Sequence, residues 1–128
     1  MKTLRIDHVI VATPDAAGVQ ATFRHHFDLE TAVPEAGGTT ALTIGPARIE
    51  CVTPVAGTAP AAALAANGEG MAALALEVAS LDDAMASLRQ AGVGFRIETS
   101  GGRRTVEVDP AAAHGVRLIL VEGDARWS

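Results

Sequence analysis

A histidine and a glutamate occupy two positions that the chain repeats later with apolar residues. His8 lies in the apolar segment that opens the first half, and Glu50 lies in the segment Arg48-Ile49-Glu50-Cys51-Val52 that closes it. In the second half, Ala73 stands in the place of His8, and Ile119 stands in the place of Glu50. Imidazole and carboxylate groups bind divalent metals and exchange protons. A cavity built symmetrically from both halves would therefore hold half of a metal site.

Further side chains join this set because residues two apart in a strand share a face. If Glu50 faces a cavity, Arg48 must face the same cavity. In the same way, if position 119 faces it, Arg117 faces it as well. The segment after Gly70 would add Met71 and Ala73 to the same lining. A guanidinium matches a carboxylate in shape and charge. We therefore expect Arg48, Arg117, Met71, Ala73 and Ile119 to contact an anionic small molecule, on which His8 or Glu50 acts as an acid or a base.

The elements that would position these residues follow the same order in each half. Residues 4–13 predict a strand rich in Val and Ile, and Thr13-Pro14-Asp15 predicts a helix start capped by Thr13. Ser80 begins a second helix that Gly92 ends. The remaining strands are predicted at residues 30–33, 39–44 and 47–53, and at 71–78, 93–98, 104–108 and 116–122. Two βαβββ modules, at about 4–53 and 70–122, are joined by a connection rich in Ala, Pro and Gly that carries a short helix near 59–66.

The amino-acid composition argues against several classes of binding partner. The chain has 128 residues, the length of a single domain, a net charge of −5 and no basic run, which argues against nucleic acid and anionic membranes. Only 3% of the residues are aromatic, too few for a groove that stacks flat molecules. A single cysteine, Cys51, excludes an internal disulfide. Without a signal-peptide pattern or a long apolar run, the expected location is cytoplasmic.

The order and spacing of several short motifs resemble the vicinal oxygen chelate superfamily, which includes glyoxalase I, bleomycin-resistance proteins and extradiol dioxygenases. Asp7-His8-Val9 resembles the start of its first module, and Arg48-Ile49-Glu50 through Thr53-Pro54 resembles the end. Gly68-Glu69-Gly70-Met71, Ala91-Gly92-Val93 and Asp109-Pro110 through His114-Gly115-Val116 are similar to the methylmalonyl-CoA epimerase branch. The resemblance implies an α+β fold in which paired βαβββ modules form a curled mixed sheet around a cavity.

The resemblance also implies where metal ligands would lie. The four family ligand positions fall on His8, Glu50, Ala73 and Ile119, and only the first two carry donor atoms. We therefore expect no tightly bound metal, although weak binding of a divalent metal is still possible. Glu77 and Glu107 would complete a metal site only if their side chains reached the same point as His8 and Glu50. The family points the residue two before Asp-Pro inward, which makes Glu107 a third candidate catalytic residue beside His8 and Glu50. In the alternative interpretation, Arg48 pairs with Glu50 or Glu107 and Arg117 stays in water at the rim.

Two classes of function remain open at this point. The first is an isomerase or lyase that acts on a small carboxylate or an acyl thioester by acid–base chemistry, without a tightly bound metal. The alternative is a non-catalytic protein of the same fold that binds a small molecule for resistance, sequestration or sensing. Exposed sheet edges in so small a chain, together with the resemblance, also predict a homodimer.

Overall fold

The chain divides into two compact units. The computed structural model describes residues 1–31, 41–100 and 103–123. The first unit is His8–Ala72, and the second unit combines Met1–Asp7 with Ala73–Ser128. Strand β1 (Thr3–Ala12) therefore contributes its first residues to the second unit and its last residues to the first unit. That the two modules form a single domain stays a prediction.

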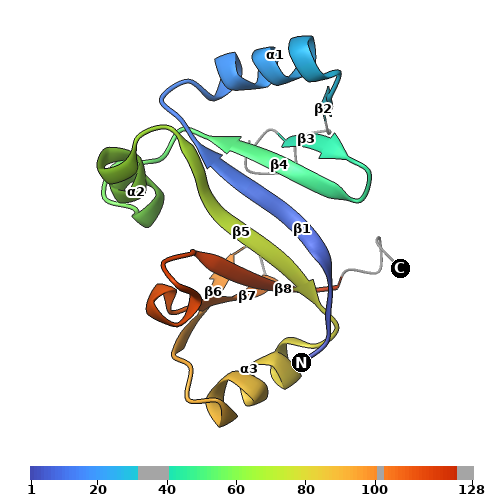
Figure 1. Ribbon diagram of the computed structural model, residues 1–128, viewed down its shortest axis with the longest axis vertical. Coiled ribbons are helices and arrows are strands. Elements are labelled where there is room, and N and C mark those ends of the chain that lie inside the picture. Colours follow the sequence, from blue (N-terminus) through green and yellow to red (C-terminus); the bar gives the residue numbers. More distant parts are fainter. Residues whose placement is uncertain (32–40, 101–102, 124–128) are drawn as a thin grey trace. The chain divides into compact units, whose positions relative to one another are not determined.

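The first unit contains a mixed sheet with the strand order β2-β3-β4-β1 (Figure 1). Strand β4 runs parallel to β1 and antiparallel to β3, and β3 runs antiparallel to β2. The helix α1 lies beside this sheet, and α2 belongs to the connection that follows. The elements after β1 are α1 (Ala16–Phe27), β2 (Glu30–Thr31), β3 (Ala41–Ile44), β4 (Ala47–Val52) and α2 (Ala59–Asn67).

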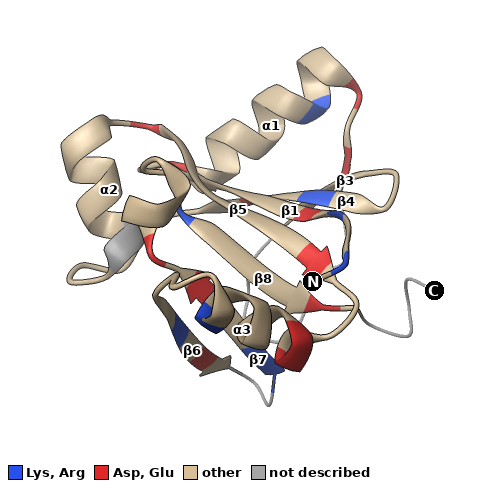
Figure 2. Ribbon diagram, turned by 60° about the horizontal axis from the view of Figure 1, so that its bottom comes forward, with Lys and Arg blue, Asp and Glu red and all other residues tan. Residues whose placement is uncertain are grey.

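The second unit repeats this plan with the strand order β5-β8-β7-β6. Strand β8 runs parallel to β5 and antiparallel to β7, which forms an antiparallel hairpin with β6. Figure 2 shows charged residues on β6 and β7 and near the ends of α3. The elements are β5 (Gly70–Val78), α3 (Leu81–Gln90), β6 (Phe95–Ser100), β7 (Arg103–Val108), a short 3-10 helix (Pro110–Ala113) and β8 (Leu118–Glu122).

These elements confirm the predicted α+β class and both βαβββ modules. Most observed boundaries agree with the predicted ones within two residues. Both β6 and β8 begin two residues later than predicted. The 3-10 helix was not predicted. The predicted strand ends at Val33 and Thr39 lie outside the described residues. Within the described part of the chain, no helix is long and apolar enough to cross a membrane.

The start of α1 differs from the prediction. Asp15, not Thr13, is the N-cap, because its carboxylate accepts a hydrogen bond from the Gly18 N–H at 3.0 Å. Thr13 is fully buried; its hydroxyl accepts from the Asp15 N–H at 3.1 Å and donates to the carboxylate of Glu69. Thr13 therefore ties the end of β1 to the residue just before β5.

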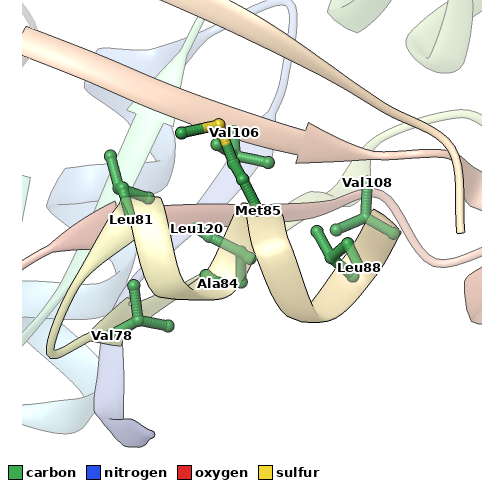
Figure 3. Close-up of a cluster of buried hydrophobic side chains, with 8 residues drawn as sticks. All are labelled: Val78, Leu81, Ala84, Met85, Leu88, Val106, Val108 and Leu120. Atoms are coloured by element: carbon green, nitrogen blue, oxygen red, sulfur yellow. The ribbon is translucent and has the colours of Figure 1, made fainter. Parts of the chain in front are cut away.

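One face of the second unit's sheet packs on α3 (Figure 3). Ser80 caps this helix by accepting from the Asp83 N–H at 3.2 Å, as the sequence predicted. The side chains on the inner face of the helix point toward the sheet. The buried cluster consists of Val78, Leu81, Ala84, Met85, Leu88, Val106, Val108 and Leu120. This packing fixes which face of β7 and β8 is left for polar side chains, because side chains alternate along each strand.

In the first unit, Cys51 lies in the interior. It is 3% exposed, and burial raises the pKa of its thiol. This agrees with the reduced, structural thiol that an apolar strand environment predicts.

We predict that Leu120→Ala lowers the free energy of unfolding by about 2–4 kcal/mol, because the change leaves a cavity in a close-packed cluster. Leu120 is 2% exposed and lies opposite Val106 in the sheet. Urea denaturation followed by circular dichroism measures the loss. Val55→Ala is the control, since Val55 is 74% exposed and its truncation should cost less than about 0.5 kcal/mol. Equal losses in the two variants would contradict this description of the core.

Candidate functional site

His8 and Glu50 lie together on one face of the first unit's sheet. Strands β1 and β4 are parallel, with His8 opposite Arg48 and Ile10 opposite Glu50. Alternation then places both side chains on the same face. The Nε2 atom of His8 is 3.4 Å from Oε2 of Glu50, which confirms the predicted proximity. Their side chains are 12% and 20% exposed, so the pair is largely shielded from water without being fully buried.

Arg48 adds a positive charge beside this pair. Its Nη2 atom is 3.8 Å from Oε1 of Glu50, and its side chain is 14% exposed. The two carboxylate oxygens of Glu50 therefore face different partners, His8 on one side and Arg48 on the other. The pairing of Arg48 with Glu50 is the one that the alternative interpretation of the sequence allowed. A carboxylate held in this way can orient the imidazole beside it.

Glu107 lies at the centre of a second polar cluster, in the second unit. Its Oε1 accepts a hydrogen bond from Nε of Arg117 at 2.8 Å, and its Oε2 accepts from Nη2 of Arg96 at 3.1 Å and from Nη2 of Arg117 at 3.4 Å. Arg117 is 20% exposed and paired, so it does not sit in water at a rim. The sequence analysis missed Arg96. The sequence did offer a signal, since Gly-Gly between two predicted strands is typical of a hairpin. The observed register of β6 and β7 sets Arg96 opposite Glu107.

This pairing limits what Glu107 can do as a base. The hydrogen bond from Arg117 holds the pKa of the Glu107 carboxyl below its ordinary value, with Arg96 adding to the effect against the opposing influence of burial. A carboxylate stabilised in its charged form is a weak proton acceptor. The catalytic role of Glu107 stays a prediction, and the structure shows that its carboxylate accepts two hydrogen bonds from Arg117. An anionic ligand would have to compete with Glu107 for that guanidinium.

Ala73 and Ile119, the second-unit counterparts of His8 and Glu50, share the face of this cluster. Ile119 lies opposite Ala75 of β5 on one side and Glu107 of β7 on the other. Ala73 is 3% exposed and its carbon-only side chain offers no donor atom. Glu77, on the same face of β5, is buried and pairs with Nε of Arg5 at 2.7 Å. Met71, expected to contact a ligand, is 71% exposed in the first unit.

The site residues predicted from the sequence therefore form two groups. His8, Arg48 and Glu50 come together in the first unit, and Glu107 and Arg117 come together in the second unit with the unpredicted Arg96. The first group combines a proton-exchanging side chain with a carboxylate and a cation. The second group is a carboxylate neutralised by two guanidinium groups.

A family model described as the Glyoxalase/Bleomycin resistance protein/Dioxygenase superfamily matches residues 5–121. The chain belongs to this superfamily. The resemblance found in the sequence is thereby confirmed, and the match extends over both βαβββ modules.

Solved structures of methylmalonyl-CoA epimerases have a similar fold. A variant of the Streptomyces coelicolor enzyme in complex with 2-nitronate-propionyl-CoA is 27% identical over 99% of both chains, with a TM-score of 0.82. A methylmalonyl-CoA epimerase in complex with methylmalonyl-CoA and NH4+ is 29% identical over 99% of both chains, with a TM-score of 0.81. The enzyme from Mycobacterium tuberculosis, at 24% identity over 97% of this chain and 91% of its own, has a TM-score of 0.81 and shows the fold alone. No curated protein matches the chain.

Many members of the superfamily use a divalent metal, and the donor set here does not fit one. His8 and Glu50 supply two donors, whereas a catalytic zinc takes three protein ligands. Among the described residues, no three His, Cys, Asp or Glu side chains gather closely enough to hold a metal ion. Glu77 and Glu107, which might have completed the set, are each paired with arginine.

We predict that Glu107→Gln lowers the free energy of unfolding by about 2–3 kcal/mol at pH 7, because the partly buried Arg117 loses its counter-charge. The pKa of Glu107 is lowered in the folded protein, so its carboxylate stabilises the fold above its ordinary pKa, and this contribution is lost as the pH falls through the lowered value. The difference between wild type and variant should therefore stay constant from pH 7 down to the ordinary glutamate pKa of about 4.3, and shrink as the pH falls below it.

Urea denaturation at each pH measures that difference. Glu98→Gln is the matched control, because Glu98 also pairs with Arg96 but is 54% exposed. Its effect should stay below about 1 kcal/mol. A Glu107→Gln effect that does not depend on pH would contradict the charged pairing with Arg117.

Proposed function

We propose that this protein is an isomerase or lyase that moves a proton on a small carboxylate or acyl thioester, and that His8 and Glu50 carry out the proton transfer. The observation that carries the proposal is the shielded pair formed by Nε2 of His8 and Oε2 of Glu50. An imidazole with a fixed carboxylate beside it is a recurrent acid–base unit in enzymes.

The chemistry would proceed through a carbanion next to a carbonyl group. His8, in its neutral form, accepts a proton from the carbon adjacent to the carbonyl, and the resulting imidazolium is stabilised by Glu50 at 3.4 Å. The electrons left by the departing proton form an enolate. Epimer formation then needs a proton delivered to the opposite face of that carbon by a second donor, such as a water molecule, while His8 passes its own proton back to solvent. Alkene formation instead breaks the bond to a neighbouring group, which leaves with that bond's electron pair and takes the proton from His8. Neither outcome requires an external oxidant or reductant, because only protons and electron pairs move.

Arg48 is suited to bind the negative charge of the ligand. Its guanidinium lies on the same face as His8 and Glu50, directly opposite His8 in the register of β1 and β4. A fixed positive charge near an enolate or a carboxylate lowers the energy of the charged species, most strongly where water is partly excluded. We assign Arg48 to this binding role, with Arg117 as a second candidate that Glu107 orients.

The relatives support the same class of ligand. The two epimerase structures that are 27% and 29% identical to this chain were solved with 2-nitronate-propionyl-CoA and with methylmalonyl-CoA, both of them esters of coenzyme A. Methylmalonyl-CoA is at once a small carboxylate and an acyl thioester, which makes it a suitable probe. The proposal differs from a metal-dependent reaction in that the steps assigned to the protein belong to His8, Glu50 and Arg48.

Hydrogen–deuterium exchange at the carbon next to the thioester tests the proposal. We expect wild-type protein in D2O to accelerate this exchange in methylmalonyl-CoA or propionyl-CoA, as measured by proton NMR. His8→Ala and Glu50→Gln should each slow the exchange by about 10²-fold or more, the usual contribution of a general acid or base. The variants should melt within a few degrees of wild type, because His8 belongs to a site and not to the buried core.

The matched control is His25→Ala, which removes an exposed histidine from α1 and should leave the exchange rate unchanged. Wild-type exchange no faster than that of free thioester would count against the isomerase or lyase. A thioester or small acid that raises the melting temperature without turnover would instead favour the non-catalytic binding protein, since a ligand that binds only the folded state stabilises it.

Metal analysis is an independent test of the reaction class. We predict that protein purified without chelators carries Zn, Ni, Co, Mn and Fe well below stoichiometric amounts, because Ala73 and Ile119 supply no donor atoms. Inductively coupled plasma mass spectrometry measures the content. About one ion per chain, lost in His8→Ala, would show that His8 is a metal ligand and would overturn the metal-free chemistry.

A further inference from the structure

A cavity lies between α1 and the end of β1, within the first unit. Its volume is about 500 Å³, which falls in the range of small-molecule sites in proteins. Val11 lines it and lies three positions after His8, so the two side chains point to opposite faces of β1. The cavity is therefore separate from the pair formed by His8 and Glu50. Besides two glycines, its lining consists of Val11, Asp15, Val19, Thr22, Phe23 and Glu69.

One wall of this cavity is apolar. Val19 and Phe23 lie one helical turn apart on α1, and Val11 adds a third apolar side chain from β1. All three are only half-buried, so a ligand can contact them. The ring of Phe23 also packs edge to face on Phe27, with 5.7 Å between the ring centroids. This wall suits the hydrocarbon part of a small molecule.

Two carboxylates line the same cavity, and Thr13 connects them. The Thr13 hydroxyl accepts from the Asp15 N–H at 3.1 Å and donates to Oε2 of Glu69. Asp15 in turn uses Oδ1 to accept from the Gly18 N–H at 3.0 Å. Each carboxylate is thus oriented by a hydrogen bond through one oxygen. Within the described part of the chain, the second oxygens, Oδ2 of Asp15 and Oε1 of Glu69, have no hydrogen-bond partner.

Gly18 leaves room for the carboxylate of Asp15. A Cβ atom at position 18 would come within 2.2 Å of Oδ2 of Asp15, far inside van der Waals contact. Glycine in a helix is less stabilising than alanine, so its presence in the first turn of α1 costs helix stability. The glycine keeps the Asp15 carboxylate in its observed position beside the cavity.

Charge complementarity identifies the ligand. The described residues that line the cavity include two carboxylates and no Lys, Arg or His. A carboxylate makes its strongest hydrogen bonds with positively charged N–H donors. We propose that this cavity binds a small organic amine. The ammonium group donates to Asp15 and Glu69, and the hydrocarbon part packs against the apolar wall.

Thr22 completes the set of acceptors for an ammonium group. Its hydroxyl donates to the Gly18 carbonyl at 3.0 Å, so its oxygen lone pairs can still accept. An alkylammonium has three N–H donors, as the lysine side chain does, and the cavity offers it three side-chain oxygens of separate residues. Mg²⁺ and Ca²⁺ take about six or more oxygen ligands. The lining therefore fits an organic ammonium better than a divalent metal ion.

Three probe molecules test the two parts of the proposal in the wild-type protein. Hexylamine should bind at least about tenfold more tightly than 1-hexanol, which has the same chain without the charge. It should also bind at least about tenfold more tightly than methylamine, which cannot cover the apolar wall. Two-dimensional NMR titration measures the affinities. The amide signals of Gly18 and Gly70, both in the cavity lining, should shift with hexylamine.

Two conservative variants test the carboxylates. Asp15→Asn keeps a good helix cap, and Glu69→Gln keeps an oxygen that can accept from Thr13. Each should weaken hexylamine binding by about fivefold and leave hexanol binding unchanged. The matched control is Asp28→Asn, which removes the same charge at the other end of α1, outside the cavity lining. It should leave the affinity for hexylamine unchanged.

The wild-type measurements decide the proposal even if a variant fails to fold. Equal affinities for hexylamine and hexanol would overturn it, as would signals of Gly18 and Gly70 that do not move. An amine preference that survives in the Asp15→Asn/Glu69→Gln double variant would also contradict it. So would tighter binding of Ca²⁺ or Mg²⁺ than of hexylamine at these residues. None of these results depends on the proton transfer proposed for His8 and Glu50.

Discussion

The alternation of side chains along the strands separates packing from chemistry in this protein. In the second unit, Val106, Val108 and Leu120 pack under α3, so Glu107 between them and Ile119 beside them must face the other way. In the first unit the same rule puts His8, Arg48 and Glu50 on one face while Cys51 is buried. A shift of one residue in either register would exchange the two faces. The apolar clusters therefore fix the position of the polar side chains.

Charged side chains on a face that is shielded from water also need oppositely charged or hydrogen-bonding partners. The two units meet this need differently. Glu107 accepts hydrogen bonds from Arg117 and Arg96, which hold the pKa of its carboxyl below the ordinary value, and Glu77 pairs with Arg5. Glu50 instead shares its charge between Arg48 and an imidazole, at the longer separations of 3.8 and 3.4 Å. The proposed proton transfer rests on this second, more widely spaced arrangement.

Short sequence patterns were sufficient to predict the features that depend on neighbouring residues. The cap at Ser80, the order of strands and the closeness of His8 to Glu50 follow from short patterns, from the repeat and from the family resemblance. The cap of α1 was assigned to Thr13 because threonine is a good cap, but a buried contact with Glu69 engages that hydroxyl and leaves Asp15 to cap the helix. The 3-10 helix after Asp109 carried a usable signal, a capping aspartate followed by proline. The pairs Arg5–Glu77 and Arg117–Glu107 join residues that are far apart or on different elements of the chain, and short sequence patterns do not report which side chains meet in space.

The division of β1 between the units has a consequence for how the chain is made. Residues Met1–Asp7 are synthesised well before their partners: the Lys2 carbonyl accepts from the Ala79 N–H at 3.0 Å, and Arg5 pairs with Glu77. The first strand segment must remain unpaired until most of the chain has been synthesised. Such distant pairings raise the contact order and slow folding, so a chaperone would have time to bind this strand segment before its partners are made.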